Sequence, residues 1–254
     1  MNTEELRKIW ENEEKKARIN GWDFSYIEGR FSSGDDELPW DMTDVINRYR
    51  RSTDRLLDID TGGGEFLLSL GHPYSLTSAT EGYPPNVELC RKKLGGLCID
   101  FRAMTDYSAM PFPDASFDIV TDRHGSYDIS EIFRVLRPGG VFITQQVGQD
   151  NDRELVEKLL PGVPCPYPGH DLKKLERELK NSGFSLLESN EVHRRISFYD
   201  TGALVWFARI IEWEFIGFSV EKCFEQLLAA EKEIQQTGSV NGRIHRFYAA
   251  ARKP

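Results

Sequence analysis

From residue 55 onward, short apolar runs alternate with amphipathic segments. This alternation is typical of successive βα units, in which the strands form a mainly parallel sheet and the helices cover it. Two more strands are predicted within 184–198 and over 243–252, so we expect a doubly wound α/β fold with a mainly parallel, seven-stranded sheet. The first five predicted strands are RLLDID (55–60), SLTSATE (75–81), LCIDF (97–101), FDIVTD (117–122) and GVFITQQV (140–147).

One helix is predicted between the fourth and fifth strands from its apolar spacing. The apolar positions fall at i, i+3, i+4 and i+7, which is the spacing of one buried helical face: Ile129, Ile132, Phe133 and Leu136. Pro138-Gly139-Gly140 then ends the helix and turns the chain into the next strand. Further helices are predicted around Leu155 and Leu159, and along Leu172, Leu175 and Leu179.

Two additions flank this predicted core. Residues 1–50 combine polar helical character with an aromatic segment, and residues 201–240 are too apolar and too helical in their spacing to form a free loop. The sequence therefore predicts four parts: an N-terminal helical and aromatic addition (1–50), the α/β core (51–200), a helical insertion (201–240) and the last core strand (241–254).

Composition narrows the partners and the compartment. A formal net charge of −9 disfavours generic nucleic-acid binding, because that affinity comes mainly from Lys and Arg neutralising phosphates. The N-terminus has no apolar signal-peptide core, no apolar run reaches the length of a membrane span, and the four cysteines form no CxxC pair. We expect a cytoplasmic protein with no metal, no membrane contact and no nucleic-acid partner.

The segment that follows the first predicted strand carries the strongest chemical indication. Leu56-Leu57-Asp58-Ile59 leads into Asp60-Thr61-Gly62-Gly63-Gly64, and EFLLSL (65–70) then reads as a helix. Glycines are required where a ligand approaches the backbone closely or where φ is positive. A nucleotide-type ligand is favoured over a plain strand-to-helix turn.

The residues around this turn favour one nucleotide class over another. A nicotinamide-binding turn has the pattern Gly-x-Gly-x-x-Gly, but here Leu67 stands where the third glycine is expected. Glu81 ends the second strand, as a carboxylate that binds a ribose does. The glycine pattern therefore disfavours NAD, whereas Glu81 is compatible with any ribose-containing cofactor.

At this point the chain resembles the class I S-adenosylmethionine-dependent methyltransferases, in particular those with a type 11 methyltransferase domain. The resemblance covers about residues 55–146 and rests on four ordered motifs, which are more specific than a single glycine loop. These motifs are LLDIDTGGGE, Glu81, MPFPDASFDIV and ISEIFRVLRPGGVFIT.

The resemblance implies S-adenosyl-L-methionine as the cofactor and a set of residues around it. Asp58 and the Gly62–Gly64 backbone would surround the methionine part, and Glu81 would accept hydrogen bonds from the ribose hydroxyls. Asp106 would bind the adenine amino group, with Tyr107 beside the ring. The full predicted set is Asp58, Asp60, Gly62, Gly63, Gly64, Glu81, Gly82, Asp106, Tyr107 and Asp122.

Asp60 is a departure from the family pattern, which has glycine at this position. Aspartate tolerates an unusual φ better than most residues, so the turn can form. The sequence leaves two interpretations open, one in which the carboxylate faces the ammonium of the cofactor and one in which the cofactor site is altered.

The loop after the fourth predicted strand supplies the candidate catalytic residues. In the resembling family this loop faces the transferred methyl group, so Arg123 and His124 are predicted to orient or deprotonate an acceptor. A structural role for His124 is the alternative. The predicted acceptor-binding aromatics are Trp40, Tyr199 and Trp206. Together with the segment around Trp213 and the loop that contains Arg123 and His124, they are expected to form a cover over the acceptor site.

We therefore expect a methyltransferase that transfers a methyl group to a small-molecule acceptor by in-line displacement. Such a reaction depends mainly on positioning, so the absence of a catalytic dyad in the sequence does not argue against an enzyme. The alternatives are a non-catalytic module that binds an adenosyl cofactor and a nicotinamide-dependent oxidoreductase. The sequence does not determine the oligomeric state.

Overall fold

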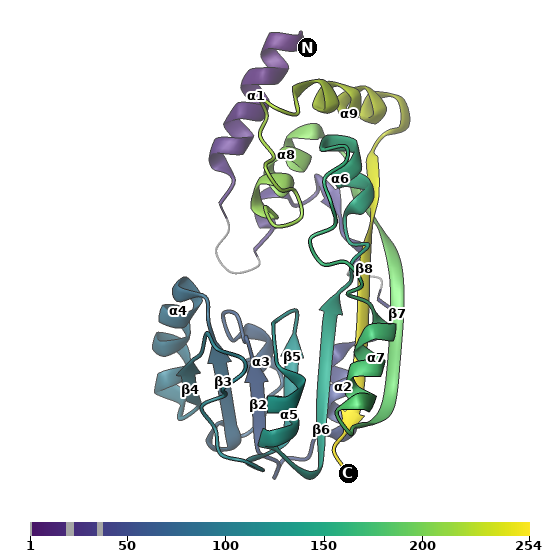
Figure 1. Ribbon diagram of the computed structural model, residues 1–254. Helices are drawn as coiled ribbons and strands as arrows, with labels where there is room; N and C mark the ends of the chain where they lie inside the picture. Colours follow the sequence, from purple (N-terminus) through teal and green to yellow (C-terminus); the bar gives the residue numbers. More distant parts are fainter. Residues whose placement is uncertain (1, 19–22, 35–37) are drawn as a thin grey trace. The chain divides into compact units, whose positions relative to one another are not determined.

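The computed structural model describes residues 2–18, 23–34 and 38–254 (Figure 1). The chain divides into two compact units. The accessory unit consists of Met1–Leu38, Gln149–Gly169 and Val192–His245, and the core unit of Pro39–Gly148, His170–Glu191 and Arg246–Pro254.

The strands form one mixed sheet in the order β1-β7-β8-β6-β5-β2-β3-β4. Neighbours among β2 to β6 are parallel, and β8 is antiparallel to β6. The predicted doubly wound, mainly parallel sheet is confirmed, with one added strand of two residues, too short for any hydrophobic period to reveal. The strands are β1 (Phe31–Ser32), β2 (Leu56–Ile59), β3 (Thr77–Glu81), β4 (Asp100–Ala103), β5 (Phe117–Arg123), β6 (Leu136–Val147), β7 (Ser185–Phe198) and β8 (Val240–Arg252).

Helices cover both faces of the core-unit sheet. Successive strand residues point to opposite faces, so Leu57 of β2 packs in a cluster with α5 and α7, whereas Leu56 packs in a second cluster with α2, α3 and α4. Figure 1 shows α5 and α7 in front of the sheet and α2 and α3 behind it. The core-unit helices are α2 (Met42–Tyr49), α3 (Glu65–Ser69), α4 (Pro84–Leu94), α5 (Ile129–Val135) and α7 (Leu172–Asn181).

Two predicted boundaries in the core unit differ from the structure. Helix α5 ends at Val135, and Leu136 has extended dihedral angles and pairs with Phe117 as the first residue of β6. Leu136 is buried as predicted, but as a strand residue, because burial alone does not distinguish the end of a helix from the start of a strand. Strand β4 begins at Asp100 because Cys98 adopts a left-handed conformation after a 3₁₀ turn.

The accessory unit has its own hydrophobic core. Its largest fully buried side chains include Trp10 of α1 and Trp206 of α8. An asparagine capping box begins α1, and Asp200 caps α8. Its helices are α1 (Thr3–Lys16), α6 (Arg153–Leu159), α8 (Thr201–Ile210) and α9 (Phe224–Thr237).

The unit boundaries differ from the predicted domain boundaries at 50, 200 and 240. Helix α2 belongs to the core unit, although it lies within the predicted N-terminal addition, of which residues 1, 19–22 and 35–37 lie outside the described residues. Strands β7 and β8 are 14 and 13 residues long and contribute to both units. Within the described chain, no helix combines the length and apolar character needed to cross a membrane.

Candidate functional site

The glycine turn follows β2 and needs left-handed backbone at three positions. The φ angles are 49° at Asp60, 62° at Gly62 and 78° at Gly64. A Cβ on Gly64 would also lie 3.1 Å from Leu94 Cδ2. The predicted requirement for positive φ is confirmed, and it extends to the aspartate that replaces the family glycine.

Two side chains of helix α4 donate hydrogen bonds to the backbone of the glycine turn. Cys90 Sγ donates to the carbonyl of Gly62 at 3.0 Å, and Lys93 Nζ donates to the carbonyl of Gly63 at 3.1 Å. The turn carbonyls are thereby bonded to this helix. Cys90 and Lys93 were not predicted as site residues, because they lie far from the turn along the chain and no local pattern indicates the contact.

Glu81 ends β3 beside the glycine turn, as predicted for a strand-end carboxylate. Its Oε2 accepts the Gly62 N–H at 2.8 Å, and its Oε1 accepts the N–H groups of Gly82 at 2.9 Å and Tyr83 at 2.8 Å. Burial raises the pKa of Glu81, and these backbone donors oppose the rise. The carboxylate therefore joins the turn after β2 to the segment after β3, and its predicted role at a ribose stays a prediction.

Asp58 lies inside β2 and is almost fully buried. Thr121 of the neighbouring strand β5 donates to its Oδ1 at 2.6 Å. Burial raises the pKa of Asp58 to about 6, and the hydrogen bond from Thr121 opposes the rise. The side chain is thus a buried acid whose charge is poorly compensated by the protein.

Asp60 connects two loops at the carboxyl end of the sheet. Its Oδ2 accepts from the Tyr107 hydroxyl at 2.6 Å and from the Ser126 N–H at 3.1 Å. Its Oδ1 is buried and has no hydrogen-bond partner among the described residues. A buried carboxylate oxygen without a donor is unfavourable, so this atom is suited to a donor or cation from a ligand.

Asp122 lies near the end of β5, and its Oδ1 accepts from Thr144 at 3.0 Å and from Gln146 at 2.5 Å. Its Oδ2 is also buried without a hydrogen-bond partner in the described parts of the chain. A Cβ on Gly125 would lie 2.5 Å from Asp122 Oδ2 and 2.6 Å from Asp60 Cβ, so glycine is required between these two acids.

The charges of neighbouring acids raise the pKa values of Asp58, Glu81 and Asp122, which are buried around the half-buried Asp60. Burial raises the pKa of Asp122 well above its usual value, and the charges of Asp60 and Asp58 raise it further. The charge of Asp60 likewise raises the pKa values of Asp58 and Glu81. A cationic ligand beside these carboxylates would stabilise their charged forms.

His124 follows β5 and is held in a defined tautomer. Trp40 Nε1–H, which can only donate, binds Gln145 Oε1 at 2.7 Å, so the Gln145 amide group must face His124. Gln145 Nε2 lies 2.9 Å from His124 Nε2, which therefore accepts the hydrogen bond. The ring is neutral with its proton on Nδ1. The adjacent Arg123 stacks on Phe66, with 4.2 Å from its guanidinium carbon to the ring centroid.

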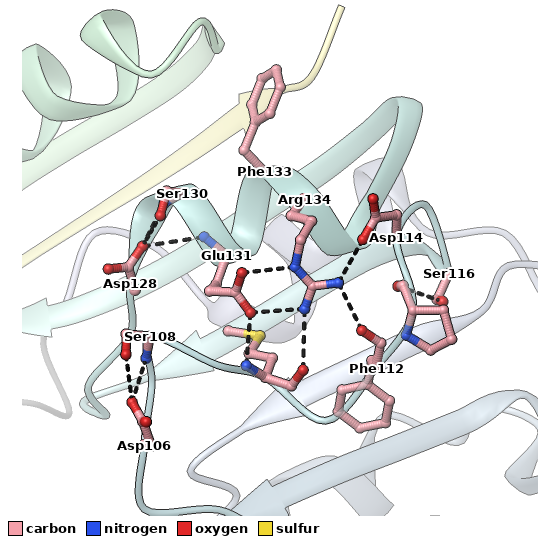
Figure 2. Close-up of polar contacts among 12 residues, drawn as sticks. Asp106, Ser108, Phe112, Asp114, Ser116, Asp128, Ser130, Glu131, Phe133 and Arg134 are labelled. Carbon is pink, nitrogen blue, oxygen red and sulfur yellow. Dashed lines mark hydrogen bonds and ion pairs between the residues drawn. The ribbon is translucent and has the colours of Figure 1, made fainter.

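Asp106 and Tyr107 lie in the loop after β4. Asp106 is exposed, and its Oδ1 accepts from the N–H of Ser108 at 2.9 Å and from the hydroxyl of Ser108 at 2.6 Å (Figure 2). These two bonds lower the pKa of Asp106. The Tyr107 hydroxyl binds Asp60, and the predicted roles of both residues at an adenine ring stay predictions.

Arg134 of α5 holds the neighbouring loop, as Figure 2 shows. Its guanidinium donates to the carbonyls of Phe112 at 2.8 Å and Met110 at 3.1 Å, and it pairs with Glu131 and Asp114. Glu131 in turn accepts the Met110 N–H at 2.7 Å. Arg134 and Glu131 therefore join the motif MPFPDASFDIV to the motif ISEIFRVLRPGG.

The three predicted acceptor-binding aromatics lie in different environments. Trp40 is half-buried in the core unit, with its ring centroid 4.9 Å from that of Tyr248. In the accessory unit, Tyr199 is 46% exposed, whereas Trp206 is 1% exposed and packs against Tyr26 with ring centroids 5.6 Å apart. Burial of Trp206 in the core of that unit is a packing role. The predicted cover over the acceptor stays a prediction.

Gln145 and Gln146 were not predicted as site residues, although both contact predicted ones. Two amides at the end of the apolar run GVFITQQV were the available indication. They lie at the carboxyl end of β6, next to β5, where open α/β sheets bind their ligands.

Comparison with known proteins identifies a methyltransferase domain in this chain. Residues 57–144 match the family described as a methyltransferase domain. Demethylmenaquinone methyltransferase of Thermus thermophilus is 32% identical over 114 residues, which cover 41% of this chain and 52% of that protein. Phthiotriol/phenolphthiotriol dimycocerosates methyltransferase of Mycobacterium tuberculosis is 31% identical over 152 residues, 50% of this chain and 55% of that protein.

The chain spans about half the length of these curated relatives. A solved structure of a protein from Bacillus halodurans C-125 superimposes with a TM-score of 0.59 at 20% identity, covering 84% of this chain and 99% of that one, and shows a shared fold. The matched segment and these relatives show that residues 57–144 of this chain form a methyltransferase domain.

Proposed function

We propose that this protein transfers a methyl group from S-adenosyl-L-methionine to a small, apolar acceptor. The observation that carries the proposal is the cluster of acids around the glycine turn, in which Asp60 Oδ1 and Asp122 Oδ2 are buried and lack hydrogen-bond partners among the described residues. Both the sulfonium and the ammonium group of this cofactor are cations. NAD offers no comparable pair of cations to these acids.

The residues present fit the cofactor. Asp58, Asp60 and the Gly62–Gly64 backbone would hold its methionine part, Glu81 and Gly82 its ribose, and Asp106 with Tyr107 its adenine. When bound, the cofactor supplies an electrophilic methyl group on a sulfonium. Since methyl transfer removes the positive charge, attraction by the acids contributes to binding more than to acceleration, and the rate must come from alignment of the acceptor.

The tautomer of His124 suggests its role in that alignment. Nε2 is occupied by the Gln145 amide and Nδ1 carries the ring proton, so His124 presents a donor rather than a general base. In the proposed site His124 would donate a hydrogen bond to an oxygen of the acceptor. Arg123, stacked on Phe66, would supply positive charge beside that oxygen.

The acceptor class is supported by the relatives. The two relatives are named for methyl transfer to demethylmenaquinone and to phthiotriol/phenolphthiotriol dimycocerosates. The negative net charge of the chain also fits an apolar acceptor better than a polyanion.

The proposal is tested in two stages with purified, full-length protein. Calorimetry should show binding of S-adenosylmethionine and its demethylated product, and much weaker binding of NADH; the reverse order would overturn the cofactor assignment. The protein is then incubated with methyl-labelled cofactor and a panel containing a quinol, a long-chain alcohol, a sterol, transfer RNA and a protein extract. Label in the organic phase supports the proposal, and label confined to RNA or protein contradicts it.

A second candidate function is a module that binds the cofactor without catalysis. Asp60 favours it, because this acid replaces the family glycine within the turn itself. Tight cofactor binding with no labelled product from any acceptor would support this candidate.

A further inference from the structure

Three side chains that share no sequence motif converge in the accessory unit. Asp150 follows β6, His193 lies in β7 and His245 in β8. His193 Nε2 lies 3.1 Å and His245 Nδ1 lies 3.7 Å from the same oxygen, Asp150 Oδ2. The three ligand atoms all lie within 4.8 Å of one another.

These distances fit a shared metal ion. At Zn–N and Zn–O distances of about 2.0–2.2 Å, tetrahedral geometry separates neighbouring ligand atoms by about 3.4 Å. The two measured separations, 3.1 and 3.7 Å, lie on either side of this value. Small side-chain rotations would bring all three atoms onto one ion.

The protonation state of His245 also suits a ligand. The backbone N–H of Asp150 donates to His245 Nδ1 over a long 3.3 Å, so this nitrogen carries a lone pair and no proton. A metal requires the same unprotonated state, and coordination would replace the long hydrogen bond. The rings of His193 and His245 stack with centroids 4.2 Å apart, which places the two imidazoles side by side.

His245 is buried and held in place by its neighbours, whereas His193 and Asp150 face solvent in part. The His245 side chain is 2% exposed, and the His245 backbone N–H donates to Asn151 Oδ1 at 3.3 Å. The side chains of His193 and Asp150 are 35% and 51% exposed. An ion could therefore enter from solvent and keep water at its remaining positions.

We propose that Asp150, His193 and His245 form a binding site for a divalent transition metal of the zinc type. Two imidazoles and one carboxylate are ligands that Zn²⁺ prefers, and a hard cation such as Mg²⁺ would favour more oxygen ligands. The ion joins β7, β8 and the segment after β6 within the accessory unit. None of the three residues belongs to the acidic cluster around the glycine turn, and the proposal does not depend on the proposed methyl transfer.

The test uses full-length, tag-free protein freed of metal with a chelator. Calorimetry with ZnCl₂ should show one equivalent bound, Co²⁺ should give the visible absorption of a four- or five-coordinate site, and Zn²⁺ should raise the melting temperature. His193→Gln and Asp150→Asn should each weaken Zn²⁺ binding by at least about tenfold, because even indirect partners of a metal contribute that much. His193 and Asp150 are partly exposed, so neither change should prevent folding.

The matched control is His170→Gln, which removes a histidine of the core unit and should leave Zn²⁺ binding unchanged. Binding by the wild type and by this control, together with its loss in the two ligand variants, supports the site. The absence of Zn²⁺ binding by the wild type, or equal affinity in His193→Gln, would show that the three side chains form only a hydrogen-bonded cluster.

Discussion

Replacing Asp60 by glycine restores the residue that the family has at this position and tests whether the added carboxylate serves the cofactor. In the structure Asp60 Oδ2 accepts hydrogen bonds from Tyr107 and Ser126, and its Oδ1 has no partner among the described residues. The substitution therefore removes the hydrogen bonds from Tyr107 and Ser126, together with the carboxylate charge and its buried, unpartnered oxygen. It also relieves the left-handed conformation at φ 49°.

The lost hydrogen bonds lower the stability of the folded protein, and the relief of the buried charge and of the left-handed backbone raises it. Both sets of effects leave the expected loss of cofactor affinity unopposed. Each hydrogen bond to the charged acceptor contributes about 1.5–3 kcal/mol, whereas burial of the carboxylate and its left-handed backbone cost a few kcal/mol, so we expect the free energy of unfolding to change by less than about 2 kcal/mol. Loss of a charged contact to the cofactor should weaken binding by about 1.5–3 kcal/mol, or about 10- to 150-fold.

Calorimetry with S-adenosylmethionine and its demethylated product measures this loss of affinity and shows which group of the cofactor Asp60 contacts. Both compounds carry the ammonium group, but only the first carries the sulfonium, so an equal loss for both assigns Asp60 to the ammonium. The matched control is Tyr107→Phe, which removes the 2.6 Å hydrogen bond but keeps the carboxylate and the aromatic ring. If the glycine variant binds as tightly as the wild type, or more tightly, Asp60 does not contact the cofactor.

Three further predictions concern residues near the glycine turn and His124. Glu81→Ala should weaken cofactor binding by about 1–3 kcal/mol in calorimetry and should also lower the melting temperature, because three backbone N–H groups lose their acceptor; an unchanged affinity would move the ribose site elsewhere. Because the pKa of Asp58 is raised from 3.8 to about 6, its contribution to stability is fully present below pH 3.8 and is lost as the pH rises through about 6. Asp58→Asn should therefore stabilise the cofactor-free protein by up to about 3 kcal/mol at pH 8, by roughly half of that at pH 5 and by almost nothing near pH 3, and a stability difference that does not depend on pH would contradict the buried charge. Gln145→Glu should place an acceptor beside His124 Nε2, raise the pKa of the imidazole in an NMR titration and change kcat more than KM; an unaltered titration would show that Gln145 does not set the tautomer.

The sequence by itself determined those strands, helices and turns that depend only on the residues within the segment. The alternation of apolar runs identified the strands and helices of the core unit, because side-chain direction follows the backbone period within each element. The glycine turn was predictable because positive φ restricts residue type at the position itself, and 62° at Gly62 confirms it. Glu81 could be placed because the carboxyl ends of parallel strands meet at one edge of the sheet.

Boundaries between elements were less predictable. Leu136 fits the apolar period of α5 and yet begins β6, because its pairing with Phe117 supplies hydrogen bonds that no local pattern encodes. The division of β7 and β8 between two units was missed for a similar reason, since each strand is continuous in sequence and its two halves differ only in what packs on them.

Only the tertiary structure decided which distant polar side chains meet. Strand β8 pairs with β6, although β7 lies between them in sequence, and this order helps to bring the segment that carries Asp150 to His193 and His245. In the same way, strand pairing brings Gln145 of β6 beside His124, which follows β5, and thereby fixes a tautomer that composition cannot reveal. Such contacts depend on strand order and register, which are set by the packing of the whole sheet, whereas the residue types at these positions are compatible with many other arrangements.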